Sequence, residues 1–162
     1  MKMRNWIFIG LITTAFISFS FQKITETTSY KCMVQLVNYD GEGAYIITSL
    51  MNPEGGYERT LFVSGDDPEW YHLIDEWWGY FGKKKRSVDG ITGATVGGGE
   101  RTVIVFEIDN YKIDQGYKLR FETSVEDQQY YPTDLEIELT SEIPAKPIDG
   151  AGYIRYVRLM TN

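Results

Sequence analysis

The fold is decided by the stretch Tyr30–Val63, which reads YKCMVQLVNYDGEGAYIITSLMNPEGGYERTLFV. It contains three segments in which apolar and polar residues alternate and β-branched and aromatic types are frequent, a pattern typical of β-strands. These segments are Tyr30–Asn38, Ala44–Met51 and Tyr57–Val63. The residues between them, 39–43 (YDGEG) and 52–56 (NPEGG), suit tight turns. The stretch therefore predicts two successive antiparallel hairpins.

Four further segments downstream have the same strand-like pattern and are separated by Gly, Pro, Asn and Asp. They are Thr102–Ile108, Tyr117–Val125, Asp134–Thr140 and Tyr153–Met160. About seven short strands with turn signals between them indicate an all-β chain, an antiparallel β-sandwich of immunoglobulin-like architecture. Ser141–Gly152 contains two prolines, and we expect it to cross from one sheet to the other.

One segment before residue 83 has the pattern of a helix. Asp67 is a suitable N-cap, Pro68 suits the first helical position and Glu69 lies near the positive end of the helix dipole. Large apolar residues then recur at spacings of three and four. They are Trp70, Leu73, Ile74, Trp77 and Trp78. We expect one short aromatic-rich helix, ending near Tyr80 and inserted before the next loop.

The N-terminus has the pattern of an export signal. Lys2 and Arg4 precede an uncharged, mainly apolar run from Trp6 to Phe21. This pattern predicts a signal peptide over residues 1–22, and the alternative is a retained N-terminal membrane anchor. Residues 23–162 then form a single domain. We expect a periplasmic or otherwise extracytoplasmic protein, membrane-anchored if the apolar run is retained.

Charge and cysteine content narrow the class of protein further. The formal net charge is −7, and losing the two positive charges of Lys2 and Arg4 makes it −9. An acidic chain lacks the basic face that nucleic acid and anionic lipid require, so we expect no nucleic-acid partner. Cys32 is the only cysteine and alternates with apolar residues, which predicts a buried thiol. With His72 as the lone histidine, we expect neither a metal site nor a catalytic residue.

The heptapeptide Asp89-Gly90-Ile91-Thr92-Gly93-Ala94-Thr95 carries the chemical signal of the chain. It resembles the acceptor motif on which bacterial flavin transferases of the ApbE type attach FMN through a phosphoester bond. In that motif the last Thr, here Thr95, carries the flavin. The resemblance assigns transferase recognition to Asp89, Gly90, Thr92, Gly93 and Ala94.

The residues around Thr95 suit such a modification, because its hydroxyl must enter the cleft of another enzyme. Gly93 and Ala94 are small, and Gly97-Gly98-Gly99 predicts added mobility on the other side. A plain connecting loop is the alternative, because Asp-Gly is a common turn dipeptide.

The similarity extends beyond the heptapeptide. Trp70 and Trp77-Trp78, followed by Val88–Thr95, are similar to a family of predicted periplasmic proteins, domain of unknown function 2271. The resemblance implies a flavin transferase that uses FAD and Mg²⁺, and a membrane-bound redox partner. The resemblance does not identify an enzymatic activity for this chain. Where a turn similar to Arg-Ala-Pro-Gly often follows the motif in that family, this chain has Val96-Gly97-Gly98-Gly99.

The aromatic residues of the predicted helix have two possible roles. Trp77 and Trp78 can stack on the planar isoalloxazine ring of a flavin, or they can fill the core beneath the helix. Our leading hypothesis is an exported electron carrier with FMN covalently attached to Thr95. The alternatives are a non-redox binding or accessory β-sandwich without flavin, and a scaffold whose heptapeptide no transferase modifies.

Overall fold

The structure is a computed structural model that describes residues 26–65, 67–82, 91–92 and 94–161. The predicted signal peptide, residues 1–22, lies outside these ranges. Seven long strands match the seven predicted segments. They are β1 (Thr27–Leu36), β2 (Tyr45–Met51), β3 (Tyr57–Ser64), β5 (Arg101–Asp109), β6 (Lys118–Ser124), β7 (Tyr130–Glu138) and β9 (Ile154–Thr161). Two short strands, β4 (Ile91–Thr92) and β8 (Ile148–Asp149), complete the described set.

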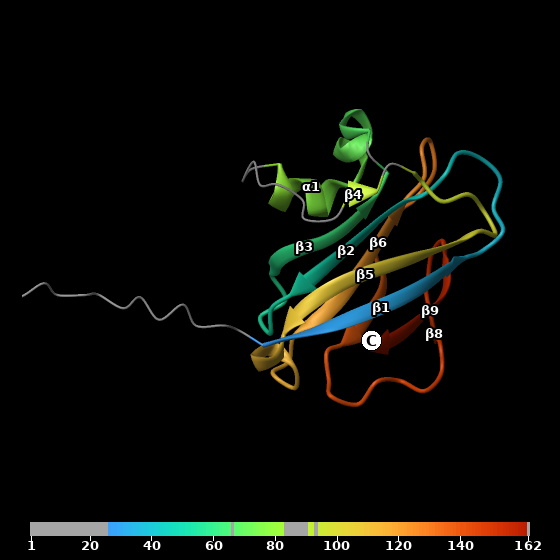
Figure 1. Cartoon of the computed structure of the whole chain (residues 1–162). Coiled ribbons are helices and arrows are strands. Elements are labelled where there is room, and N and C mark those ends of the chain that lie inside the picture. Colours follow the sequence, from blue (N-terminus) through green and yellow to red (C-terminus); the bar gives the residue numbers. More distant parts are fainter. Residues whose placement is uncertain (1–25, 66, 83–90, 93, 162) are drawn as a thin grey trace, which may run out of the picture.

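The strands form two stacked sheets, so the predicted all-β sandwich is confirmed (Figure 1). One sheet has the order β5-β1-β9-β8 and the other has the order β4-β3-β2-β6-β7. Neighbours pair antiparallel except β3 and β4, which are parallel. Residues 141–152 join β7 of the second sheet to β9 of the first, as the two prolines predicted.

The first predicted hairpin is wrong and the second is confirmed. β1 pairs with β5 and β9, whereas β2 pairs with β3 and β6, so the chain changes sheets between Leu36 and Tyr45. Backbone hydrogen bonds hold this connection from outside it: Val37 N donates to Tyr153 O and Ala44 N donates to Val96 O. A glycine-rich turn can therefore connect two sheets as well as two paired strands. Which of the two it does depends on the strands with which β1 and β2 pair.

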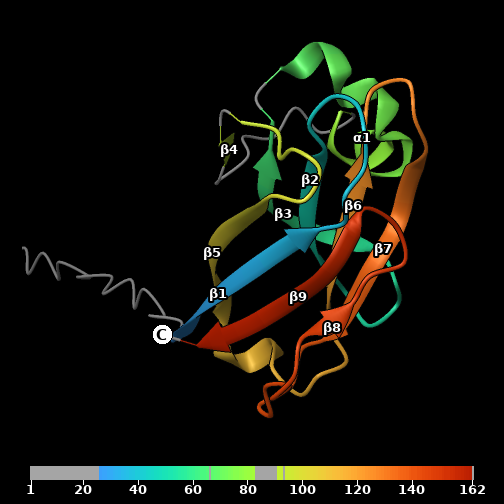
Figure 2. The same ribbon diagram turned by 90° about the vertical axis from the view of Figure 1, so that its right-hand side faces the viewer.

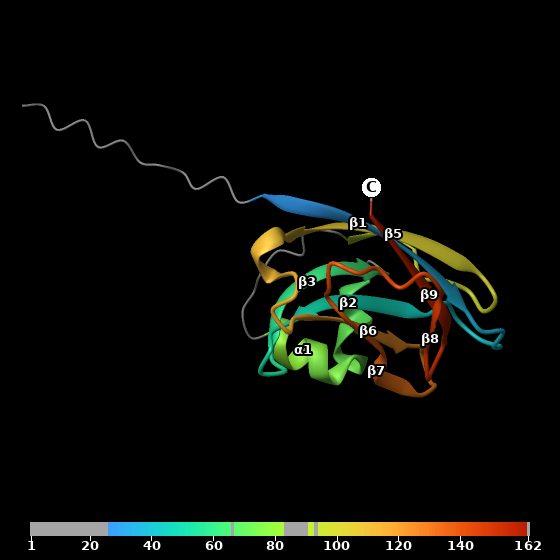
Figure 3. The same cartoon turned by 90° about the horizontal axis from the view of Figure 1, so that it is seen from below.

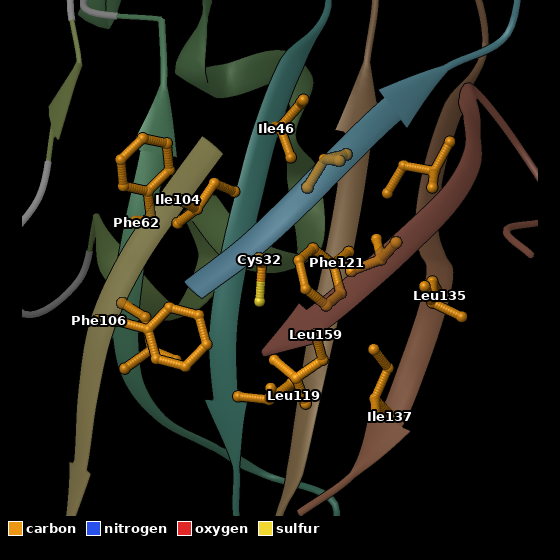
Figure 4. Close-up of a cluster of buried hydrophobic side chains, with 14 of the residues drawn as sticks. Cys32, Ile46, Phe62, Ile104, Phe106, Leu119, Phe121, Leu135, Ile137 and Leu159 are labelled. Carbon is orange, nitrogen blue, oxygen red and sulfur yellow. The ribbon is translucent and has the colours of Figure 1, made fainter. Parts of the chain in front are cut away.

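The five-stranded sheet is covered on both faces, as Figure 3 shows from below. One face packs on the other sheet and encloses the main core, to which most long strands contribute (Figure 4). The other face packs on the helical segments through Ile47, Val63, Ile74 and Trp77. Every residue of β2 is therefore buried. Cys32 is completely buried in the main core, as predicted.

The helical segment differs from the single helix we expected. It is divided at Ile74 into a 3₁₀ helix, η1 (Pro68–Leu73), and α1 (Asp75–Phe81). The start is as predicted, because the Asp67 side chain accepts a hydrogen bond from Glu69 N at 3.0 Å. The buried residues are Tyr71 in η1, Ile74 at the break and Trp77 in α1. Trp70, Leu73 and Trp78 are only half-buried.

Candidate functional site

The described part of the motif lies in the segment that crosses from one sheet to the other. Ile91–Thr92 form β4 and pair with Val63 and Ser64 at the end of β3. Figure 2 shows the chain leaving β4, passing the loop between β1 and β2, and returning to β5. Of the predicted recognition residues, Asp89, Gly90 and Gly93 lie outside the described residues, as does the side chain of Thr92.

Hydrogen bonds fix the backbone on both sides of Thr95. On one side, the Ser64 hydroxyl donates to Ala94 O at 2.7 Å. On the other side, Val96 and Ala44 exchange two backbone hydrogen bonds of 2.7 and 3.0 Å. The Tyr39 hydroxyl also donates to Val96 O at 2.8 Å. Thr95 is therefore held between two anchored neighbours, in a segment that is not part of a continuous strand ladder.

The Thr95 side chain is half-buried, while Ala94 beside it is exposed. Two glycines pack closely against it. A Cβ atom on Gly43 would lie 2.3 Å from Thr95 Oγ1, and one on Gly65 would lie 3.2 Å from Thr95 Cγ2. Small residues therefore border this threonine on two sides.

The glycines after Thr95 have a different role from the predicted mobility. A Cβ atom on Gly98 would lie 2.2 Å from Tyr39 O, so this glycine permits a close approach of two backbones. Gly99 has φ of +75° and donates its N–H to Val37 O at 2.8 Å. The Glu100 carboxylate accepts from Gly97 N at 3.0 Å. This turn packs against the loop after β1.

Aromatic rings lead from Thr95 to the helical segments. The Tyr45 ring lies against Gly65, where an added Cβ would be 2.4 Å from it. Tyr45 packs edge-on against Tyr71, with ring centroids 6.2 Å apart, and the Tyr71 hydroxyl donates to Gly65 O at 3.0 Å. Tyr71 in turn contacts Trp77 and Trp78, with centroids 5.2 and 6.0 Å away. We call Tyr45, Tyr71, Trp77, Trp78 and Phe81 the aromatic cluster.

The two predicted stacking residues occupy different environments. Trp77 has no exposed surface, stacks on Phe81 at 4.7 Å and donates its indole N–H to Thr60 Oγ1 at 2.9 Å. It fills the core under the helix, so its faces are not available to a flavin in this structure. Trp78 is half-buried and retains the predicted stacking role as a hypothesis.

A second group of polar residues lies under the same helical layer. Glu122 on β6 has no exposed surface, and its carboxylate accepts hydrogen bonds from the hydroxyls of Tyr57, at 2.7 Å, and Tyr130. Burial raises the Glu122 pKa to about 7, although both tyrosine hydrogen bonds and the charge of Arg120 oppose that rise. The carboxyl therefore changes its charge near neutral pH.

Sequence reasoning missed Tyr45, Tyr71 and Glu122. Tyr71 lies within the predicted helix but was not counted in its apolar face, although it is three residues before Ile74. Tyr45 and Glu122 meet their partners across strands far apart in the chain, so no local signal could have identified them. In the described parts of the chain, no group of three His, Cys, Asp or Glu side chains could hold a metal ion. No helix there is long and apolar enough to cross a bilayer.

The fold and the motif segment define a two-sheet β-sandwich with a helical layer and a half-buried threonine at a sheet crossing. The chain belongs to the family described as predicted periplasmic protein (DUF2271), whose model matches residues 27–156. That description supports an extracytoplasmic location. Searches of curated proteins and of solved structures found no match.

Proposed function

We propose that the protein carries FMN as a phosphoester on Thr95 and relays electrons outside the cytoplasm. The observation that carries the proposal is the setting of Thr95. Its side chain is half-buried, bordered by Gly43 and Gly65, and held by anchored neighbours. A modifying enzyme needs a hydroxyl that is presented in a defined position, and the anchored backbone on both sides of Thr95 supports this requirement.

The residues present fit a flavin phosphate and ring. Thr95 Oγ1 would form the bond to phosphorus, displacing AMP from FAD in the cleft of the transferase. Ala94 beside the threonine is exposed, and Gly43 and Gly65 place no side chain against it. Trp78 offers a partly exposed aromatic surface on the cluster that begins at Tyr45. The flavin supplies one- and two-electron chemistry, while the protein supplies position and environment.

Co-expression with an ApbE-type flavin transferase tests the proposal. Intact mass under denaturing conditions should show one covalently retained FMN, and Thr95→Val should lack it. Thr95→Ser keeps a hydroxyl and should retain modification. Thr133→Val changes an exposed threonine on β7 and should be modified like the wild type.

The transferase must be shown to be active on an acceptor of its own in the same cells. An unmodified wild-type chain under those conditions overturns the proposal. A colourless chain would favour the alternative hypothesis, a non-redox binding module without flavin.

A further inference from the structure

Strand β5 forms a free edge of the four-stranded sheet. Its register with β1 runs from Arg101 opposite Gln35 to Asp109 opposite Thr27, and it is the last strand in the order β5-β1-β9-β8. No strand in the described ranges pairs with its other side. Figure 2 shows β5 at the margin of this sheet. A long edge strand presents unpaired backbone groups that can accept another strand.

The backbone groups that face the free edge can be assigned from hydrogen bonds. Leu36 N donates to Glu100 O, and Asn110 N donates to a carbonyl just before β1, so even-numbered residues face β1. Directions alternate along a strand, and odd-numbered residues therefore face outward. The Arg59 side chain, which comes from β3, donates to Glu107 O and agrees with this assignment.

The same odd-numbered residues place their side chains on the open face of the sheet. Arg101, Val103, Val105 and Glu107 are all exposed, with exposed fractions of 47% for Val103 and 54% for Val105. The order is positive, apolar, apolar, negative. The two valines lie at equal distances from Ile104, and so do the two opposite charges. Such a strand is complementary to an antiparallel copy of itself.

We propose that two copies of this chain pair through β5, antiparallel, about a two-fold axis at Ile104. In this register Arg101 lies opposite Glu107 of the second copy, and Val103 lies opposite Val105, each twice by symmetry. All four positions have outward-facing backbone groups, so each opposed pair exchanges two hydrogen bonds. Glu107 O can keep its bond from Arg59, because a carbonyl oxygen accepts two hydrogen bonds.

Charge selects this register over its neighbours. A shift of the axis by one residue toward Val103 opposes Arg101 to Val105, and a shift toward Val105 opposes Val103 to Glu107. Only the register centred on Ile104 matches both the opposite charges and the two valines. Cross-strand pairs of these kinds stabilise a sheet, whereas like charges in the same positions oppose pairing.

Charge reversal tests the proposal by sedimentation velocity of the purified chain, without flavin, over a wide range of concentration. The wild type should show a monomer–dimer equilibrium. Arg101→Glu and Glu107→Arg each place like charges opposite one another twice, and each should raise the dissociation constant about tenfold or more. The double variant Arg101→Glu/Glu107→Arg restores opposite charges and should return the dissociation constant toward the wild-type value.

Two further variants distinguish an effect at the β5 edge from an effect elsewhere in the sheet. Arg158→Glu makes the same charge change on β9, two strands from the edge, and should leave the dimer unchanged. Val105→Pro removes an outward N–H without touching the β1 ladder and should weaken the dimer. Circular dichroism confirms that each variant is folded.

A chain that is monomeric at every concentration overturns the proposal. So does a dimer that is insensitive to both single reversals, or one that the double variant fails to restore. None of these outcomes bears on the flavin at Thr95, because the dimer is measured without it.

Discussion

Gly43 occupies a position that only glycine can fill while Thr95 keeps its place. A Cβ atom there would lie 2.3 Å from Thr95 Oγ1 and 2.7 Å from Thr95 Cβ. We expect Gly43→Ala to displace Thr95, to cost about 1–3 kcal/mol of stability and to reduce flavin incorporation sharply. Thermal unfolding and intact mass after co-expression measure the two effects.

Gly79→Ala is the matched control, because an added Cβ at Gly79 in α1 meets nothing within 4 Å. This change should stabilise the helix by about 0.5–1 kcal/mol and leave flavin incorporation unchanged. Full flavin incorporation in Gly43→Ala would contradict the role given to Gly43.

Glu122 makes stability depend on pH in the direction opposite to that of an ordinary ion-paired carboxylate. Burial raises its pKa in the folded chain from an ordinary value of 4.5 to about 7. Between these values the folded state holds a proton that the unfolded state has lost, so stability falls as pH rises through this window. The full effect is about 3 kcal/mol. Urea unfolding at pH 5 and pH 8 should show most of this loss.

Glu122→Gln cannot ionise, so its unfolding free energy should change less between the two pH values. Glu136→Gln serves as the comparison. Although burial raises the Glu136 pKa, its hydrogen bond to Arg120 lowers that pKa overall, so this group adds little slope above pH 5, and in the opposite direction. An unchanged slope in Glu122→Gln would show that another group is responsible.

At the scale of elements, the helical layer depends on one tryptophan more than on the other. Trp77 is fully buried and hydrogen-bonded to Thr60, whereas Trp78 is half-buried. Trp77→Ala should cost about 3–5 kcal/mol because it leaves a large cavity and an unpaired hydroxyl. Trp78→Ala should cost about 1 kcal/mol. Denaturant midpoints measure both, and equal losses would contradict the assignment.

The sequence predicted where the helical layer begins, but not that it is divided into a 3₁₀ helix and an α-helix. Asp67 and Pro68 are local signals, and the cap they predicted is present. The break at Ile74 depends on how Tyr71 and Trp77 both reach the sheet, which is a property of the packed layer. Trp77 and Trp78 are the same residue type, so the difference in their burial can be recognised only when the surface of the sheet beneath them is known.

At the scale of the whole molecule, alternation predicted each long strand but not its partners. Residues 30–63 gave three strands, of which β2 and β3 are hairpin neighbours and β1 belongs to the other sheet. Pairing is decided by β5, β6 and β9, which come much later in the chain. The candidate site shows the same division: the motif identified Thr95, and distant segments supplied Gly43, Gly65 and Tyr45 around it.

Cys32 has a practical consequence for chemical labelling. It is the only thiol of the chain, it has no exposed surface, and burial raises its pKa to about 12. A thiol reagent will therefore not react with Cys32 in the native protein, because the thiol is buried and the thiolate is the reactive form. It will react only when the two sheets separate. The rate of alkylation then reports the opening of the sandwich. A cysteine introduced at an exposed position would be modified alone, which allows a spectroscopic probe to be placed without replacing the native thiol.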